Sequence, residues 1–165
     1  MNDFQVLARF NQWVNGRLYG CAAQLSDEDY RADRGAFFGS VHATLNHILI
    51  GDRLWFGRIA GDVPAEIKSL DQILHDDPAA LKAAREAMDE RIIDIVDGLG
   101  DSGLDEEITF HQLSRPGDFI QPARRMLQTV FNHQTHHRGQ VHCLLTQAGI
   151  EVPPLDVMIY LRGAG

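Results

Sequence analysis

Four long segments of the sequence repeat apolar residues at the three- and four-residue spacing of an α-helix. They cover about residues 3–24, 41–61, 78–99 and 122–149. Ser40 suits the N-cap of the second segment, and Pro78 and Pro122 suit the first turns of the third and fourth. Helices of this kind bury their apolar stripes against one another. The sequence therefore predicts an all-α four-helix bundle.

The connections between these segments differ in length and character. Residues 62–78 are polar and contain two prolines, which predicts a long crossover that lets the second and third helices run parallel. Residues 31–40 read as a connection that returns aromatic side chains to the core. Residues 106–122 alternate around Ile108, Phe110 and Leu113 and turn at Arg115–Asp118, which predicts a short irregular hairpin before the fourth helix.

Composition and charge fit one globular domain over residues 1–165, with 44% hydrophobic and 23% charged residues. The formal net charge of −8 repels a phosphate backbone, so we expect no nucleic-acid partner. No apolar run approaches the roughly 20 residues needed to cross a bilayer, and the first residues lack the pattern of a signal peptide. We therefore expect a cytoplasmic protein without a membrane partner.

The two cysteines, Cys21 and Cys143, lie far apart in the sequence and form no CxxC motif. This spacing predicts two buried free thiols rather than a disulfide framework or a thiolate metal site. If the protein binds a metal ion, nitrogen must supply most of the ligands.

Residues 131–142 contain four of the eight histidines, all on the fourth predicted helix. At 100° per residue, His137 and His133 lie roughly 40° and 80° from the centre of the apolar face, whereas His142 and His136 lie roughly 100° and 140° away. His133 and His137 are therefore predicted to face the core, and His136 to face outward.

Two inward histidines one helical turn apart lie about 5–6 Å from each other and can bind one ion. The zinc-protease motif HExxH has the same spacing, but Gln134 replaces its glutamate and cannot accept a proton. The alternative is a structural role in which the pair only forms hydrogen bonds within the bundle. A third ligand must come from another helix, where His42 and His47 point to nearly opposite sides. Periodicity does not choose between these two.

Three stretches of the chain resemble the DinB family, also called the DinB/YfiT-like metalloproteins, and the resemblance extends over essentially the whole sequence. They are FNQWVNGRLY (10–19), GAFFGSVHATLNHILIGDRLWFGRI (35–59) and FNHQTHHRGQVHCLLTQAG (131–149). The resemblance implies a four-helix bundle that binds one metal ion through three histidines, one on the second helix and two on the last. It implies His47, rather than His42, as the ligand that joins His133 and His137.

Several polar residues are expected to support such a site. Asp52 and Arg138 are predicted to form a buried ion pair, because a charge inside a bundle requires a partner. A solvated Asp52 is the alternative. Gln134, Gln140 and His136 are expected to lie next to the metal ligands without binding the ion themselves.

Three neutral imidazoles leave a divalent ion its full charge and open coordination positions, as in catalytic sites. An all-nitrogen set fits Zn or Ni first, with Fe or Cu as alternatives. Trp13 and Trp55 are expected in the core or in the wall of a cavity above the ion.

Because relatives in the DinB family include enzymes that use low-molecular-weight thiols, the resemblance implies a metal-dependent enzyme of the thiol S-transferase or hydrolase type. Its substrate would be a small molecule, and no residue is assigned as general base. The alternative is a non-catalytic metal-binding or stress-responsive module. The resemblance also implies a homodimer.

Overall fold

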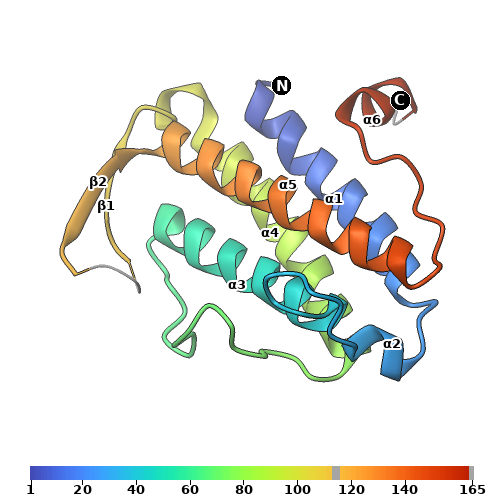
Figure 1. Ribbon diagram of the computed structural model, residues 1–165. Helices are drawn as coiled ribbons and strands as arrows, with labels where there is room; N and C mark the ends of the chain where they lie inside the picture. Colours follow the sequence, from blue (N-terminus) through green and yellow to red (C-terminus); the bar gives the residue numbers. More distant parts are fainter. Residues whose placement is uncertain (113–115, 164–165) are drawn as a thin grey trace.

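The computed structural model describes residues 1–112 and 116–163 and is mostly helical (Figure 1). Its four long helices are α1 (Asp3–Ala22), α3 (Val41–Ala60), α4 (Pro78–Gly103) and α5 (Ala123–Gln147). Two short helices, α2 (Asp27–Arg31) and α6 (Val157–Gly163), lie outside this set. The predicted all-α four-helix bundle is confirmed.

The four long helices pack side by side. α1 packs against α4 and α5, and α3 packs against the same two helices. In Figure 1, α3 and α4 run in one direction, and α1 and α5 run in the opposite direction. The connection over residues 61–77 passes along the outside of the bundle between the end of α3 and the start of α4 (Figure 1). This is the predicted long crossover.

Local sequence signals explain where the helices begin and end. The side chain of Ser40 accepts a hydrogen bond from the Ala43 amide and caps α3, which ends at Gly61 in the left-handed conformation (φ 79°). Asp77 caps α4, and Pro78 occupies its first turn. The helix extends beyond the predicted end at Leu99, because a further turn follows the non-helical Gly100.

The predicted hairpin before the last helix is present. β1 (Glu107–His111) pairs with β2 (Asp118–Pro122) in an antiparallel ladder, in which Phe110 faces Phe119. Part of the predicted turn, Arg115, and the apolar Leu113 lie outside the described residues. Pro122 precedes α5 as its N-cap residue instead of occupying its first turn.

The connection before α3 differs from the prediction in part. The short helix α2, whose N-cap is Ser26, ends at Arg31, where the predicted connection begins. Only one of its two phenylalanines turns inward: Phe37 is 82% exposed, whereas Phe38 is half-buried.

The core consists of apolar side chains from all four long helices, and α3 is buried on most sides, as its sequence predicts. Cys21 is buried, but the prediction of a buried Cys143 is wrong. Cys143 lies on the exposed face of α5, between the buried Val141 and Leu144. Within residues 1–112 and 116–163, no helix combines the length and apolar character needed to cross a membrane.

Candidate metal centre

Three imidazole rings meet between α3 and α5. The Nε2 atom of His47, on α3, lies 3.1 Å from Nε2 of His133 and 3.2 Å from Nε2 of His137, both on α5. The nitrogen atoms of the three rings that face one another lie within 4.8 Å. The structure thus brings together the three side chains that the sequence and the family resemblance selected. We call them the histidine triad.

Two of these rings form a hydrogen bond at Nδ1, the nitrogen that faces away from the other rings, and this bond fixes which nitrogen carries the proton. His47 donates its Nδ1–H to the carbonyl oxygen of Leu70 at 2.7 Å, and His137 donates its Nδ1–H to Oε1 of Gln140 at 2.8 Å. A neutral imidazole protonated at Nδ1 carries a lone pair at Nε2. The contact of 3.2 Å between these two Nε2 atoms therefore joins two hydrogen-bond acceptors, which requires a proton or a cation between them.

The third ring, His133, has a different environment. Its Nδ1 atom is buried and has no hydrogen-bond partner among the described residues. Its Cε1 atom lies so close to α3 that a Cβ atom added to Gly51 would be 2.8 Å away. A glycine at position 51 therefore makes the room that the His133 ring occupies.

Burial keeps the triad neutral. Burial, together with the neighbouring His137, His47 and His136, lowers the pKa of His133 to about 3. Burial also lowers the pKa of His47 and the pKa of His137 below the usual value for histidine. At neutral pH the three rings are therefore in the deprotonated form that binds metal ions.

The geometry of the triad fits one metal ion. Metal–nitrogen bonds of about 2.0–2.1 Å in a tetrahedral arrangement place two ligand nitrogens about 3.3–3.4 Å apart, close to the observed separations. A ring of Phe38 stacks on His47 with 3.9 Å between the centroids and covers one side of the site. Hydrogen bonds to the far nitrogens of ligating histidines are typical of metal sites, because they fix the tautomer and the ring orientation.

A cavity of about 220 Å³ adjoins the triad. Its wall consists of one face of α3, one residue of the crossover, one residue after β1 and one ring of the triad from α5. These residues are His47, Gly51, Leu54, Trp55, Arg58, Leu70, Gln112 and His133. Trp55 was expected either in the core or in the wall of a cavity, and it lies in the wall of this one. Trp13 packs against Phe10 and Tyr160 instead.

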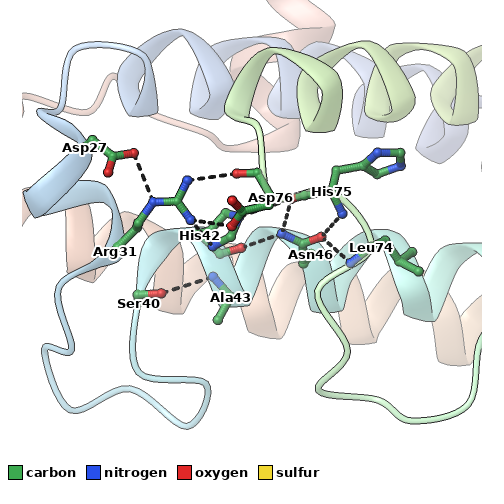
Figure 2. A network of polar contacts seen from close by, with 9 residues as sticks. All are labelled: Asp27, Arg31, Ser40, His42, Ala43, Asn46, Leu74, His75 and Asp76. Atoms are coloured by element: carbon green, nitrogen blue, oxygen red, sulfur yellow. Dashed lines mark hydrogen bonds and ion pairs between the residues drawn. The ribbon is translucent and has the colours of Figure 1, made fainter.

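His42 belongs to a network of polar contacts with residues before α3 and in the crossover (Figure 2). Its Nδ1 atom lies 3.3 Å from Nη1 of Arg31, and its Nε2 atom lies 3.1 Å from the carbonyl oxygen of His75. Both ring nitrogens are therefore occupied by other groups. Of the two candidates on α3, only His47 reaches the pair on α5.

Asn46, next to His47, attaches the crossover to α3 (Figure 2). Its Oδ1 atom accepts hydrogen bonds from the backbone amides of Leu74 and His75, each at 3.0 Å, and its Nδ2 atom donates to the carbonyl oxygen of His75 at 3.2 Å. The same crossover supplies the Leu70 carbonyl to His47. Neighbouring residues of α3 thus hold the crossover, and the crossover in turn orients one ring of the triad.

The predicted ion pair between Asp52 and Arg138 is wrong. Asp52 is fully buried and accepts a hydrogen bond from Nη1 of Arg85 at 2.5 Å, whereas Arg138 donates to Oδ1 of Asn11. The alternative of a solvated Asp52 is also wrong. Arg85 lies on α4, and its guanidinium, rather than that of Arg138, reaches the carboxylate from the facing helix.

The remaining polar candidates divide between the triad and the buried charges. Gln134 is fully buried and donates to Oδ1 of Asp52 at 2.7 Å, so it contacts the charges and not the imidazoles. Gln140 does contact a ring of the triad, that of His137. His136 is exposed, as predicted, with its ring 4.8 Å from that of His137.

Three features of the site were not predicted: the Leu70 carbonyl, the space at Gly51 and the Phe38 ring. A backbone carbonyl has no signal in a sequence. A glycine within an apolar helix is a detectable signal, because it lowers helix propensity and indicates a close approach of another group.

Comparisons with known proteins agree with this architecture. The model of the DinB family matches residues 1–164. The chain is 26% identical over 170 residues to Protein DinB of Bacillus subtilis strain 168, and the match covers 98% of this chain and 95% of that protein.

Two solved structures have a similar fold. A DinB-like protein from Bacillus cereus ATCC 10987 matches with a TM-score of 0.67 and 20% identity, over 86% of this chain and 90% of that one. A DinB-like protein from Bacillus subtilis matches with a TM-score of 0.67 and 19% identity, over 92% of this chain and 98% of that one.

Proposed function

The chain belongs to the DinB family, and we propose that it is a metal-dependent enzyme whose single divalent ion is bound by Nε2 of His47, His133 and His137. The ion is Zn or Ni in this proposal, and the reaction is a thiol S-transfer or a hydrolysis on a small molecule. The observation that carries the proposal is the 3.2 Å contact between Nε2 of His47 and Nε2 of His137, since both atoms carry lone pairs.

The donor set supports a catalytic site more than a closed structural one. Three protein ligands leave at least one coordination position open, and the cavity beside the triad gives access to it. A divalent ion in this position acts as a Lewis acid that lowers the pKa of a coordinated water or thiol toward neutrality.

The chain's own residues would prepare the site for that ion. The Leu70 carbonyl and the Gln140 side chain hold the His47 and His137 rings in the tautomer that presents Nε2. The Phe38 ring covers His47 and limits the access of water from its side. No carboxylate lines the described part of the cavity, so the proposal assigns no general base.

Metal analysis tests the ligand set. Protein purified without a histidine tag is expected to bind one equivalent of Zn or Ni, and His47→Ala and His133→Ala are expected to lose it. His42→Ala and His136→Ala are matched controls, because they remove one buried and one exposed histidine from the same two helices. Equal metal contents in all four variants would show that the ion, if bound, lies elsewhere.

Turnover tests the catalytic part separately. The metal-loaded protein is assayed against a panel of electrophiles with added thiols and against ester and amide substrates. Metal-dependent turnover that disappears in His133→Ala supports an enzyme. A loaded but inert protein supports the alternative of a non-catalytic metal-binding or stress-responsive module.

A further inference from the structure

One face of α3 connects the histidine triad to an arginine. His47, Gly51, Leu54, Trp55 and Arg58 follow one another at helical spacing, and all five line the cavity beside the triad. Arg58 lies three turns beyond His47, about 16 Å along the axis at about 1.5 Å per residue. Side chains on a helix point back toward its N-terminus, so the Arg58 side chain extends in the direction of His47.

The Arg58 guanidinium lies against two aromatic rings. Its Cζ atom is 4.8 Å from the ring centroid of Trp55 and 5.4 Å from that of Phe110. The two rings attract the cation but supply no carboxylate to its N–H groups. Among residues 1–112 and 116–163, no carboxylate forms an ion pair with Arg58, and its buried Nε atom has no hydrogen-bond partner.

Two other arginines of the bundle have the carboxylate partners that Arg58 lacks among the described residues. Arg53, on the same helix, forms an ion pair with Glu66, and the buried Arg85 forms ion pairs with Asp52 and Asp89. A half-buried guanidinium without a carboxylate is costly in free energy, and burial lowers the pKa of Arg58 accordingly. An anion bound in the cavity would offset that cost.

The charges around the cavity point to the same class of ligand. The described wall contains no acidic side chain, and three neutral imidazoles leave a divalent ion its full positive charge. The cavity is therefore positive at the triad and positive again at Arg58. A ligand that carries a metal-binding group and an anionic group matches both.

We propose that this cavity binds a small molecule with a metal-coordinating head and an oxyanion, carboxylate or phosphate, and that Arg58 determines specificity by binding the oxyanion. The planar guanidinium forms two parallel hydrogen bonds with such a group. This inference rests on the proposed metal site and adds the substrate class to it.

Cobalt-loaded protein provides the test, because a thiol that coordinates Co²⁺ produces a charge-transfer absorption band. The probes are ω-mercaptocarboxylates of increasing chain length, the corresponding ω-mercaptoalkyl phosphates, and neutral ω-mercaptoamides. At the best chain length, an oxyanion probe is expected to bind at least about tenfold more tightly than its amide. The series with the larger preference identifies the anion as carboxylate or phosphate.

Two variants on α3 separate Arg58 from a general effect of charge. Arg58→Met is expected to abolish the preference while it leaves the affinity for the amides and the Co²⁺ content unchanged. Arg53→Met removes the same charge from the same helix outside the cavity, and it is expected to keep the preference. Arg58→Lys retains the charge without the two parallel hydrogen bonds and is expected to retain a smaller preference.

The outcomes distinguish failure of the inference from failure of the metal site. If Co²⁺ binds and the probes show no preference, the inference is wrong and the metal site stands. The same holds if the preference persists in Arg58→Met, because the oxyanion then chelates the ion itself. If the protein binds no Co²⁺, the proposed function is wrong and the inference is lost with it.

Discussion

Two groups of polar residues lie inside the same bundle and have different properties. The first, which we call the charged cluster, consists of Asp52, Arg85, Asp89 and Arg138 with the amides of Asn11, Asn15 and Gln134. The second is the histidine triad. Each charge of the charged cluster contacts another member, so its charges are paired among the described residues, although Nε of Arg85 and Oε1 of Gln134 have no hydrogen-bond partner there.

The triad has no such internal pairing. Two of its three Nε2 atoms are acceptors that face each other, and the only other polar atom that the described residues bring to either of them is Nε2 of His133, 3.1 Å from that of His47. The difference shows that buried polar groups in one bundle can serve different ends. The charged cluster fixes how the four helices pack, since all four contribute to it. The triad is arranged to bind a cation, which the chain itself does not supply.

Breaking the charged cluster should have the largest effect on stability. Arg85→Met removes the cation that Asp52 and Asp89 share, and it leaves two buried carboxylates without their partner. We expect the free energy of unfolding of the metal-free protein to fall by about 3–5 kcal/mol, measured by chemical denaturation. Arg91→Met, which removes an exposed partner of Asp62, is the control and should change it by about 1 kcal/mol or less. Similar losses in both variants would show that the charged cluster contributes no more than a surface ion pair.

Crowding the triad should have a smaller effect on stability and a clear effect on metal binding. In Gly51→Ala the new Cβ would lie 2.8 Å from Cε1 of His133, so the ring must move. We expect metal affinity to fall about 10- to 100-fold, by analogy with the loss of groups that orient ligands, and stability to fall by about 1–3 kcal/mol. Gly20→Ala on α1, where a Cβ meets nothing within 4 Å, is the control for adding a methyl group to a helix. Unchanged metal affinity in Gly51→Ala would place His133 outside the metal site.

A fall in pH should lower the stability of the metal-free protein through His133 of the triad. The pKa of His133 is lowered to about 3 in the folded protein, whereas it is about 6.5 in the unfolded chain, so the unfolded state takes up the proton first. The resulting stability is present above about pH 6.5 and is lost as the pH falls toward 3. Each proton contributes a slope of at most about 1.4 kcal/mol per pH unit. Thermal unfolding of the metal-free protein should show this loss, and His133→Gln should show a shallower one; equal slopes would mean that His133 is not held neutral by the fold.

Much of the fold follows from local signals in the sequence. The four apolar stripes, the cap at Ser40 and the proline at the start of α4 predict the helices, because these signals act within a few residues of each other. The proline-containing crossover predicts that α3 and α4 run parallel. The end of α4 was less predictable, since Gly100 interrupts the helix without ending it.

The site was predictable only in part. The amphipathic pattern of α5 places His133 and His137 on its inner side, but α3 is buried on most sides, so its pattern does not distinguish His42 from His47. The family resemblance selects His47, and the structure agrees that this ring reaches the other two.

The pairing of the buried charges depends on which residues of different helices face each other, and the sequence does not contain that register. The sequence therefore does not indicate whether Asp52 pairs with Arg138 or with Arg85. Arg58 raises no expectation in the sequence either, because the absence of a partner is visible only when the surrounding residues are in place.

The attachment of the crossover to Asn46 limits how this loop can change in length. Leu70 is bound to His47, and Leu74 and His75 are bound to the residue beside it, so the few residues between these contacts span a fixed distance. Residues inserted there would displace the Leu70 carbonyl and release the His47 ring to rotate, even though every helix remained intact. Variation in loop length among related chains should therefore fall before Leu70, where the crossover is free of these contacts.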